Sequence, residues 1–149
     1  IKEPNRRIIE NEWQKLFIRL RSEIIVCNCG RTNFTSMFEN VDESTYRCPK
    51  CGAEFVSLAF SNRDYRMPLY VGSKFYECEI DPRSDDFQKV VGELVENKLK
   101  PGMLGIKNSS GKTWRVKMPD GVFYDIASGK GFPLWKGLEI DFGDVNAHI

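Results

Sequence analysis

The feature that most constrains the fold of this chain is a group of four cysteines within residues 26–55. They form two close pairs, one spaced C-x-C and the other C-x-x-C: Cys27 with Cys29, and Cys48 with Cys51. Such a group can be a metal site, a disulfide framework or a redox centre. A disulfide framework requires an oxidising compartment and would leave one of the five cysteines unpaired. A redox C-x-x-C normally lies between a strand and a helix, whereas here a strand is predicted to follow.

A structural metal explains the spacing best. Gly30 and Gly52 directly follow the two pairs, and a glycine at that place lets the chain turn so that backbone N–H groups point at the sulfurs. The β-branched run 24–26 leads into the first pair, and residues 53–57 after the second pair favour another strand. This order predicts a zinc ribbon over 27–57, in which four thiolates close a tetrahedral site around one structural Zn²⁺. The alternative is four reduced thiols in a small hairpin, which would have too little core to hold itself together.

The segment 1–26 is predicted to form an amphipathic helix, over residues 5–23, that leads into the ribbon, with Asn5 as its N-cap. Apolar residues recur at steps of three and four and form one stripe: Ile9, Trp13, Leu16, Phe17, Leu20 and Ile24. We expect this stripe to pack on a neighbouring part of the fold while the charged face stays in solvent. The alternative is a helix that docks a partner, with Trp13 as the anchor.

After the ribbon, the sequence predicts a linker over 58–66 and a β-sandwich over 67–149. Roughly seven to nine short strands are expected in about 80 residues, a density typical of a sandwich. The segment 113–126 reads as a hairpin that turns at Pro119-Asp120-Gly121. Apolar and polar residues alternate clearly in three segments: 76–80, 114–118 and 138–142. The predicted fold class is therefore mainly β, with an N-terminal helix and a small zinc ribbon.

The chain offers no set of residues suited to catalysis. Its only histidine, His148, is the penultimate residue, so a nucleophile system that needs a histidine would have to use the chain end. The Gly-Lys-Gly at 129–131 lacks the strand–loop–helix context of a phosphate-binding loop. The fifth cysteine, Cys78, lies in an alternating segment and is expected to be a buried apolar thiol rather than a fifth ligand. We therefore predict a non-catalytic fragment.

Charge gives little support to nucleic-acid binding. The formal net charge is +1, with basic and acidic residues spread evenly along the chain, whereas nucleic-acid binders usually concentrate positive charge. The alternative to consider is a nucleic-acid-binding ribbon whose surface combines stacking and phosphate contacts. Its residues would be Arg31, Arg47, Lys50, Phe34 and Phe38. Acidic neighbours in the ribbon oppose it: Glu39, Asp42, Glu43 and Glu54.

Several stretches carry a resemblance to a known family. They are "NEWQKLFIRLR", the ribbon, "PLYVGSKFY", "GIKNSSGKTWRVKMPDG" and "PLWKGLEIDFGDVNAHI". Together they resemble the C-terminal region of bacterial eukaryotic-like serine/threonine kinases that accompany a von Willebrand type A protein of the TerY kind and a protein phosphatase. The resemblance implies that the part after the ribbon is a forkhead-associated (FHA)-like β-sandwich. Domains of this kind read phosphothreonine with their loops.

The resemblance also points to a candidate phosphopeptide or partner loop. Asn108, Ser109 and Ser110 resemble the loop that lies beside the peptide in such domains. Ser73 and Lys74 stand where the family has Gly-Arg, and no Ser-x-x-His is present. The chain therefore lacks the planar guanidinium that pairs bidentately with phosphate, and Lys74 offers only a point charge. The alternative for the Asn-Ser-Ser segment is an ordinary turn closed by side-chain hydrogen bonds.

We therefore expect a regulatory module that docks signalling partners of a kinase, namely the von Willebrand type A protein and the phosphatase. Nucleic-acid binding and a purely structural or dimerising role are the alternatives. No apolar run approaches the length of a membrane span and no secretory signal pattern is present, so we expect a cytoplasmic protein. Because the chain begins with Ile rather than Met, we expect it to be a fragment of a longer protein.

Overall fold

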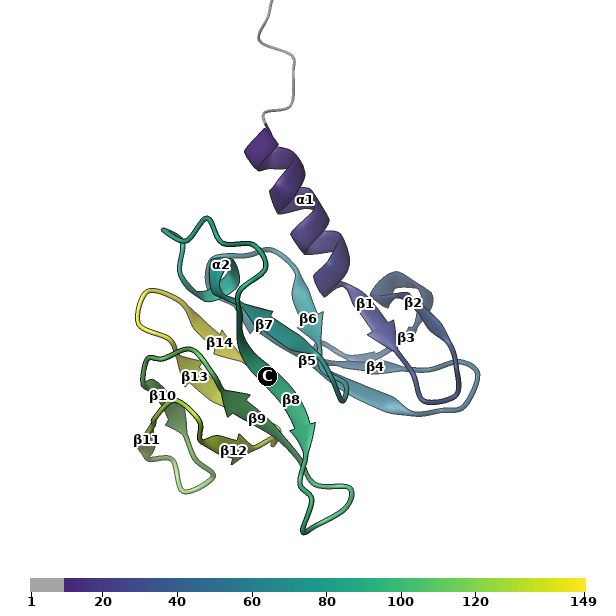
Figure 1. Ribbon diagram of the computed structural model, residues 1–149. Helices are drawn as coiled ribbons and strands as arrows, with labels where there is room; N and C mark the ends of the chain where they lie inside the picture. Colours follow the sequence, from purple (N-terminus) through teal and green to yellow (C-terminus); the bar gives the residue numbers. More distant parts are fainter. Residues whose placement is uncertain (1–9) are drawn as a thin grey trace, which may run out of the picture.

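The computed structural model describes residues 10–149 and is mainly β (Figure 1). One helix, α1 (Glu10–Ser22), precedes the ribbon, so the predicted N-cap Asn5 and Ile9 of the apolar stripe lie outside the described residues. None of the helices in the described part is both long and apolar enough to cross a membrane. The predicted architecture of an N-terminal helix followed by antiparallel sheets is confirmed.

The cysteine region consists of two small antiparallel units. The first is the hairpin β1 (Ile24–Val26) and β2 (Thr32–Phe34), followed by a 3-10 helix over Thr35–Met37. The second is formed by β3 (Glu39–Asp42), β4 (Thr45–Arg47) and the first part of β5 (Glu54–Phe60). A separate small core lies between these units. Ile25 and Phe38 are buried there beside Cys27 and Cys48.

Two antiparallel sheets enclose the main core. The larger has the strand order β11-β10-β13-β14-β5-β4-β3, with β6 (Arg66–Pro68) also paired to β5. The smaller has the order β12-β9-β8-β7. The other strands are β7 (Lys74–Tyr76), β8 (Val90–Glu96), β9 (Leu104–Asn108), β10 (Trp114–Lys117), β11 (Phe123–Ile126), β12 (Gly131–Pro133), β13 (Glu139–Asp141) and β14 (Asn146–His148). Side chains of both sheets meet in one buried cluster that includes Phe75, Leu94, Trp114 and Ile140.

The predicted hairpin over 113–126 is confirmed. Strands β10 and β11 pair from Trp114 opposite Ile126 to Lys117 opposite Phe123. The turn between them is closed by the N–H of Gly121, which donates to the carbonyl of Met118 at 2.8 Å. Asp120 Oδ1 accepts from the N–H of Val122 at 2.9 Å. A turn built from Pro, Asp and Gly closes locally, which is why it is predictable from sequence.

Strand β5 belongs to both the cysteine region and the main body, so the predicted linker over 58–66 is wrong for its first part. The strand pairs with β4 from Arg47 opposite Glu54 to Thr45 opposite Val56. It then continues into pairing with β6 and β14. Leu58 and Phe60 alternate into the main core and are buried. The cysteine region is therefore joined to the body by continuous sheet.

The segment 76–80 is helical and not the strand that its alternation predicts. Strand β7 ends at Tyr76, and α2 (Glu77–Ile80) follows as one turn. Glu79 turns back so that its carboxylate accepts from the N–H of Tyr76 at 2.9 Å, which satisfies a backbone donor at the start of the turn. Cys78 is half-buried in this turn, and burial raises the pKa of its thiol to about 11. A thiol with so high a pKa stays protonated and unreactive near neutral pH.

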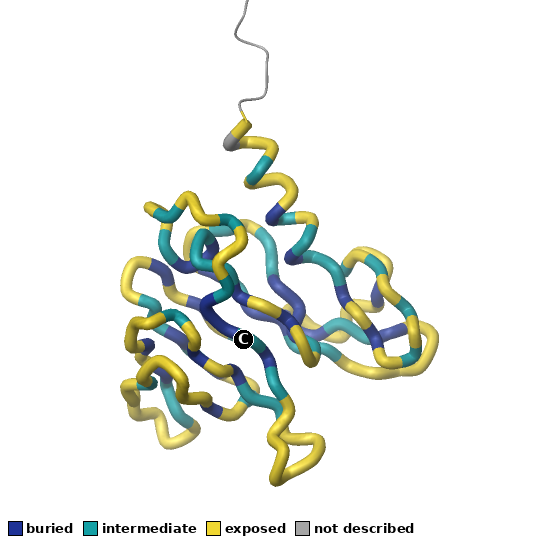
Figure 2. The backbone as a smooth tube through the Cα atoms, in the orientation of Figure 1, coloured by how far each residue is buried: buried dark blue, intermediate teal, exposed yellow. Residues whose placement is uncertain are grey.

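The apolar stripe of α1 does not pack on the body, so that expectation is wrong. Trp13, Leu16, Phe17 and Leu20 are exposed, and Figure 2 shows the first turns of the helix in solvent. The buried positions are Ile18 and Ser22, on another side of the helix. Polar contacts near the helix C-terminus determine this orientation, and the hydrophobic period carries no information about them.

Candidate metal centre and polar loops

The four cysteines of the ribbon converge on one point. Their sulfurs all lie within 4.8 Å of one another. Two contacts cross between the pairs, with Cys27 Sγ 3.5 Å from Cys51 Sγ and Cys29 Sγ 3.7 Å from Cys48 Sγ. Four sulfurs placed tetrahedrally at a Zn–S distance of about 2.3 Å would be separated by about 3.8 Å. The cluster can therefore hold one metal ion between the two pairs.

Each cysteine pair lies on a tight turn closed by the glycine that follows it. The N–H of Gly30 donates to the carbonyl of Cys27 at 2.9 Å, and the N–H of Gly52 donates to the carbonyl of Cys48 at 2.8 Å. The φ angles of these glycines are 87° and 76°, values that residues with a Cβ rarely adopt. The predicted role of Gly30 and Gly52 in turning the chain is confirmed.

The electrostatics of the cluster favour a bound cation. Burial raises the pKa of the Cys48 thiol, but backbone N–H groups of Cys51 and Lys50 outweigh burial and bring this pKa down to about 7. The backbone near Cys29 lowers the pKa of Cys27, whereas burial and the neighbouring thiols raise it to about 12. Four thiols this close cannot all ionise without a cation, since each thiolate repels the next. A divalent ion removes that repulsion.

Lys50 links the two turns. Its ammonium donates to the carbonyl of Cys29 at 3.0 Å, so a residue of the second pair's turn holds the backbone of the first. The sulfurs of Cys27 and Cys48 are covered, while Cys51 lies at the exposed edge. Lys50 thus joins the two turns that carry the four sulfurs.

The predicted phosphopeptide residues are only partly brought together. Asn108 is fully buried at the end of β9, and all of its side-chain hydrogen bonds are internal. Its Nδ2 donates to the carbonyls of Lys112 and Ile126 at 2.8 and 2.9 Å. Its Oδ1 accepts from the N–H and the Oγ of Ser110 at 2.9 and 2.7 Å. Ser109 is exposed beside this turn.

Ser73 and Lys74 lie elsewhere. The Ser73 hydroxyl is buried and accepts from the N–H of Tyr70 at 2.8 Å. Lys74 is exposed on β7, opposite Glu93 of β8. Both residues border a small pocket below the C-terminal end of α1, which is lined also by Arg21 and Tyr76. Among the described residues, no hydrogen bond joins either of them to the Asn108 turn.

Asn108→Ala is expected to destabilise the fold by about 2–4 kcal/mol, because it leaves two carbonyls without donors and removes the acceptor for Ser110. Equilibrium denaturation measured by tryptophan fluorescence checks this value. Ser109→Ala, at the exposed neighbouring position, should change the free energy of unfolding by less than about 0.5 kcal/mol. Equal effects of the two substitutions would contradict a structural role for the asparagine.

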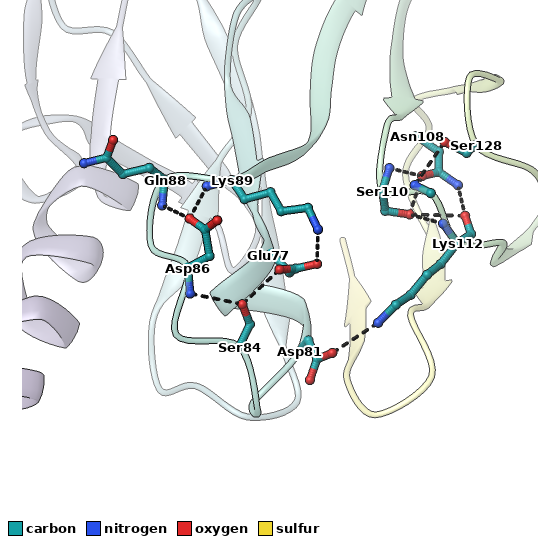
Figure 3. A network of polar contacts seen from close by, with 11 residues as sticks. Glu77, Asp81, Ser84, Asp86, Gln88, Lys89, Asn108, Ser110, Lys112 and Ser128 are labelled. Atoms are coloured by element: carbon teal, nitrogen blue, oxygen red, sulfur yellow. Dashed lines mark hydrogen bonds and ion pairs between the residues drawn. The ribbon is translucent and has the colours of Figure 1, made fainter.

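A polar network missed by the sequence analysis surrounds this turn (Figure 3). Lys89 Nζ donates to Glu77 at 2.8 Å, and Lys112 Nζ donates to Asp81 at 3.1 Å. The backbone N–H of Arg83, together with Lys112, lowers the pKa of Asp81 to about 2. Lys89 and Lys112 are therefore each paired with a carboxylate of the same chain. The acidic residues can be read from the sequence, but their partners come from distant segments.

A second missed feature is the buried carboxylate of Glu79, whose side chain is 1% exposed. Ser22 Oγ of α1 donates to it at 2.6 Å, and Arg63 Nη1 lies 3.4 Å from the same oxygen. Arg63 also donates to Tyr65 Oη and to the carbonyl of Cys78. This cluster fixes the end of α1 to α2 and to the loop after β5. A buried glutamate in an alternating segment gives no sequence signal for such a role.

Comparison with known proteins finds no matching family model, no significantly similar curated protein and no significantly similar solved structure.

Proposed function

We propose that this chain is a non-catalytic regulatory module of a serine/threonine kinase, stapled by one structural Zn²⁺, that docks signalling proteins. The observation that carries the proposal is the convergence of Cys27, Cys29, Cys48 and Cys51 on two preformed turns. Four thiolates fill a tetrahedral zinc site and leave no position for a water or a substrate. The metal then serves to build a surface, which is the usual purpose of such a site in an interaction module.

The nature of the metal follows from its ligands. Sulfur-only tetrahedral sites are occupied by zinc or by iron–sulfur centres. The separations of 3.5 and 3.7 Å between sulfurs suit a single ion of the size of zinc. Metal analysis of the purified chain tests this step: we expect one Zn²⁺ per chain, and colour or iron in the preparation would contradict it.

The FHA-like character of the body remains part of the proposal. Two antiparallel sheets with one shared core agree with it. The loops, however, favour docking over the reading of phosphothreonine. The side chain of Asn108 forms its hydrogen bonds with backbone and side-chain groups of the same chain. Lys112 and Lys89 form ion pairs with carboxylates. A phosphate bound by Lys89 or Lys112 would have to displace these carboxylates, at the cost of their ion pairs.

We therefore predict binding to partner proteins that does not depend on phosphate. The test is binding of the zinc-loaded chain to the von Willebrand type A protein and to the phosphatase, and to threonine peptides with and without phosphate. Paired peptides should show affinities within about two-fold of each other, a difference below 0.5 kcal/mol. Phosphate-dependent binding that Lys74→Ala weakens would overturn the phosphate-independent mode. Failure to bind either protein would overturn the docking proposal itself.

The ribbon is a poor surface for nucleic acid. Phe38 is buried and packs edge-on against Phe55 with ring centroids 6.2 Å apart, so it is not available for stacking on bases. Arg47 is paired with Glu54 at 2.7 Å, and Lys50 is bound to the backbone of Cys29. Salt-sensitive binding of labelled DNA or RNA in fluorescence anisotropy would revive this alternative.

A further inference from the structure

Among the described residues, the largest group of exposed apolar side chains on one element lies on α1, and a second molecule could cover it. Trp13, Leu16, Phe17 and Leu20 lie on one face of the helix, and Phe17 is 61% exposed. Trp13 and Phe17 stack on each other with centroids 5.9 Å apart. A soluble surface rarely keeps such a patch uncovered. The helix projects from the body, so this face is open to a second molecule (Figures 1 and 2).

We propose that the occupant is α1 of a second copy of this chain, in an antiparallel pair. The first reason is the spacing of the apolar residues, which is symmetric about the point between Leu16 and Phe17. In an antiparallel pair with its two-fold axis at that point, Trp13 lies opposite Leu20 of the partner subunit. Leu16 then lies opposite Phe17 of the partner subunit. The same patch serves on both chains, as an isologous interface requires.

The second reason is charge. The first turn of α1 carries Glu10 and Glu12, and the last turn carries Arg19 and Arg21. Residues seven and eleven apart return to the same side of a helix, after about two and three turns. Glu12 and Arg19 therefore border one side of the apolar face, and Glu10 and Arg21 border the other.

An antiparallel pair places Glu12 of each copy beside Arg19 of the other copy. Arg21 does not take the same role on the other side, because its guanidinium stacks on Tyr76 and donates to the carbonyl of Phe87. A parallel pair would instead place acidic ends together and basic ends together, which is unfavourable. Arg19 can turn toward Glu12 of the other copy, because its ion pairs within the chain are long: 3.4 Å to Glu23 and 3.5 Å to Asp64.

The interface is small, which sets the expected affinity. A helix of 13 residues is about 20 Å long, and stable interfaces usually bury about 800 Å² on each partner. We therefore expect a concentration-dependent dimer with a Kd of about 1–100 µM rather than a permanent one. This inference concerns self-association and does not depend on the identity of the docked signalling partners.

Sedimentation equilibrium of the zinc-loaded chain tests the proposal. Trp13→Ala with Phe17→Ala should raise the Kd at least about ten-fold. Leu99→Ser is the matched control, because Leu99 is 91% exposed but lies on the loop between β8 and β9, and it should leave the Kd unchanged. A chain that stays monomeric up to about 1 mM would overturn the proposal, and so would a dimer insensitive to the helix variants.

The orientation of the pair has its own test. Glu12→Lys should weaken the dimer, because it places two cations together at each end of an antiparallel pair. The double variant Glu12→Lys with Arg19→Glu should restore wild-type association, since the charges then again alternate between copies. In a parallel pair, where the acidic ends lie together, Glu12→Lys would instead relieve repulsion and strengthen the dimer, and that result would overturn the antiparallel arrangement. Circular dichroism of each variant confirms that α1 remains helical.

Discussion

Chelation of the metal is expected to unfold the cysteine region while the main sheets stay folded. The ribbon's own core is limited to a few residues around Ile25 and Phe38, and a structural zinc contributes about 10–16 kcal/mol in small zinc-dependent folds. The main core, with Trp114 and Phe75, contains none of the four cysteines. Amide hydrogen exchange should therefore show lost protection in β1 to β4 and retained protection in β8, β9 and β10.

Cys48→Ser is expected to have the same effect as chelation, because it removes a buried ligand and leaves an incomplete site. Cys78→Ser provides the matched control, since Cys78 is remote from the cluster and should leave the zinc content at one ion per chain. Strand β5 should lose protection only in its first half, where it pairs with β4. Retained protection of β1 to β4 after complete metal removal would show that the ribbon holds itself together without a metal.

Glu79→Ala is expected to destabilise the chain by about 3–5 kcal/mol, the usual cost of breaking a buried ion pair from one side. It leaves the partly buried guanidinium of Arg63 without its carboxylate and the hydroxyl of Ser22 without its acceptor. Chemical denaturation measures the loss of stability. The physical reason is desolvation, because these groups have no water to replace the lost carboxylate.

The Glu79 substitution should also release α1 from the body, which separates it from an ordinary loss of stability. Limited proteolysis should cut between α1 and β1 sooner in Glu79→Ala than in the wild-type chain. Glu43→Ala, at an exposed glutamate in the turn between β3 and β4, is the control and should change the free energy of unfolding by less than about 0.5 kcal/mol. A similarly small effect of Glu79→Ala would contradict the role of the buried carboxylate.

The features predicted well from the sequence are turns whose hydrogen bonds join residues that are close along the chain. The hairpin of β10 and β11 depends on Pro119-Asp120-Gly121, and the two cysteine turns depend on the glycines that follow them. The convergence of the four cysteines was also predicted, from the spacing of the two pairs, although the two turns belong to separate antiparallel units. The hydrogen bonds that close these turns join residues only three or four positions apart.

The predictions that failed involve contacts between distant segments. The alternation of 76–80 predicts a strand. In the structure, one helical turn places the carboxylate of Glu79 where Ser22 donates a hydrogen bond to it and Arg63 forms an ion pair with it. A linker was predicted over 58–66, yet Leu58 and Phe60 continue β5 into the core. Ser73 and Lys74 are separated from the Asn108 turn by β8, which pairs with β7 on one side and with β9 on the other; their part in a partner loop stays a prediction.

By itself, the sequence determined that the chain is mainly β, that an amphipathic helix precedes the cysteines and that four thiols gather in a small region. These outcomes follow from periodicity, turn chemistry and cysteine spacing, all of which act over short distances along the chain. Only the tertiary structure decided which side of α1 faces the body, because Ser22 reaches a carboxylate 57 positions away. Ile18 and Ser22 are the positions of α1 buried against the body, so the apolar stripe on the other side stays exposed in the single chain. A contact between residues so far apart in the sequence leaves no trace in the local periodicity from which helices are predicted.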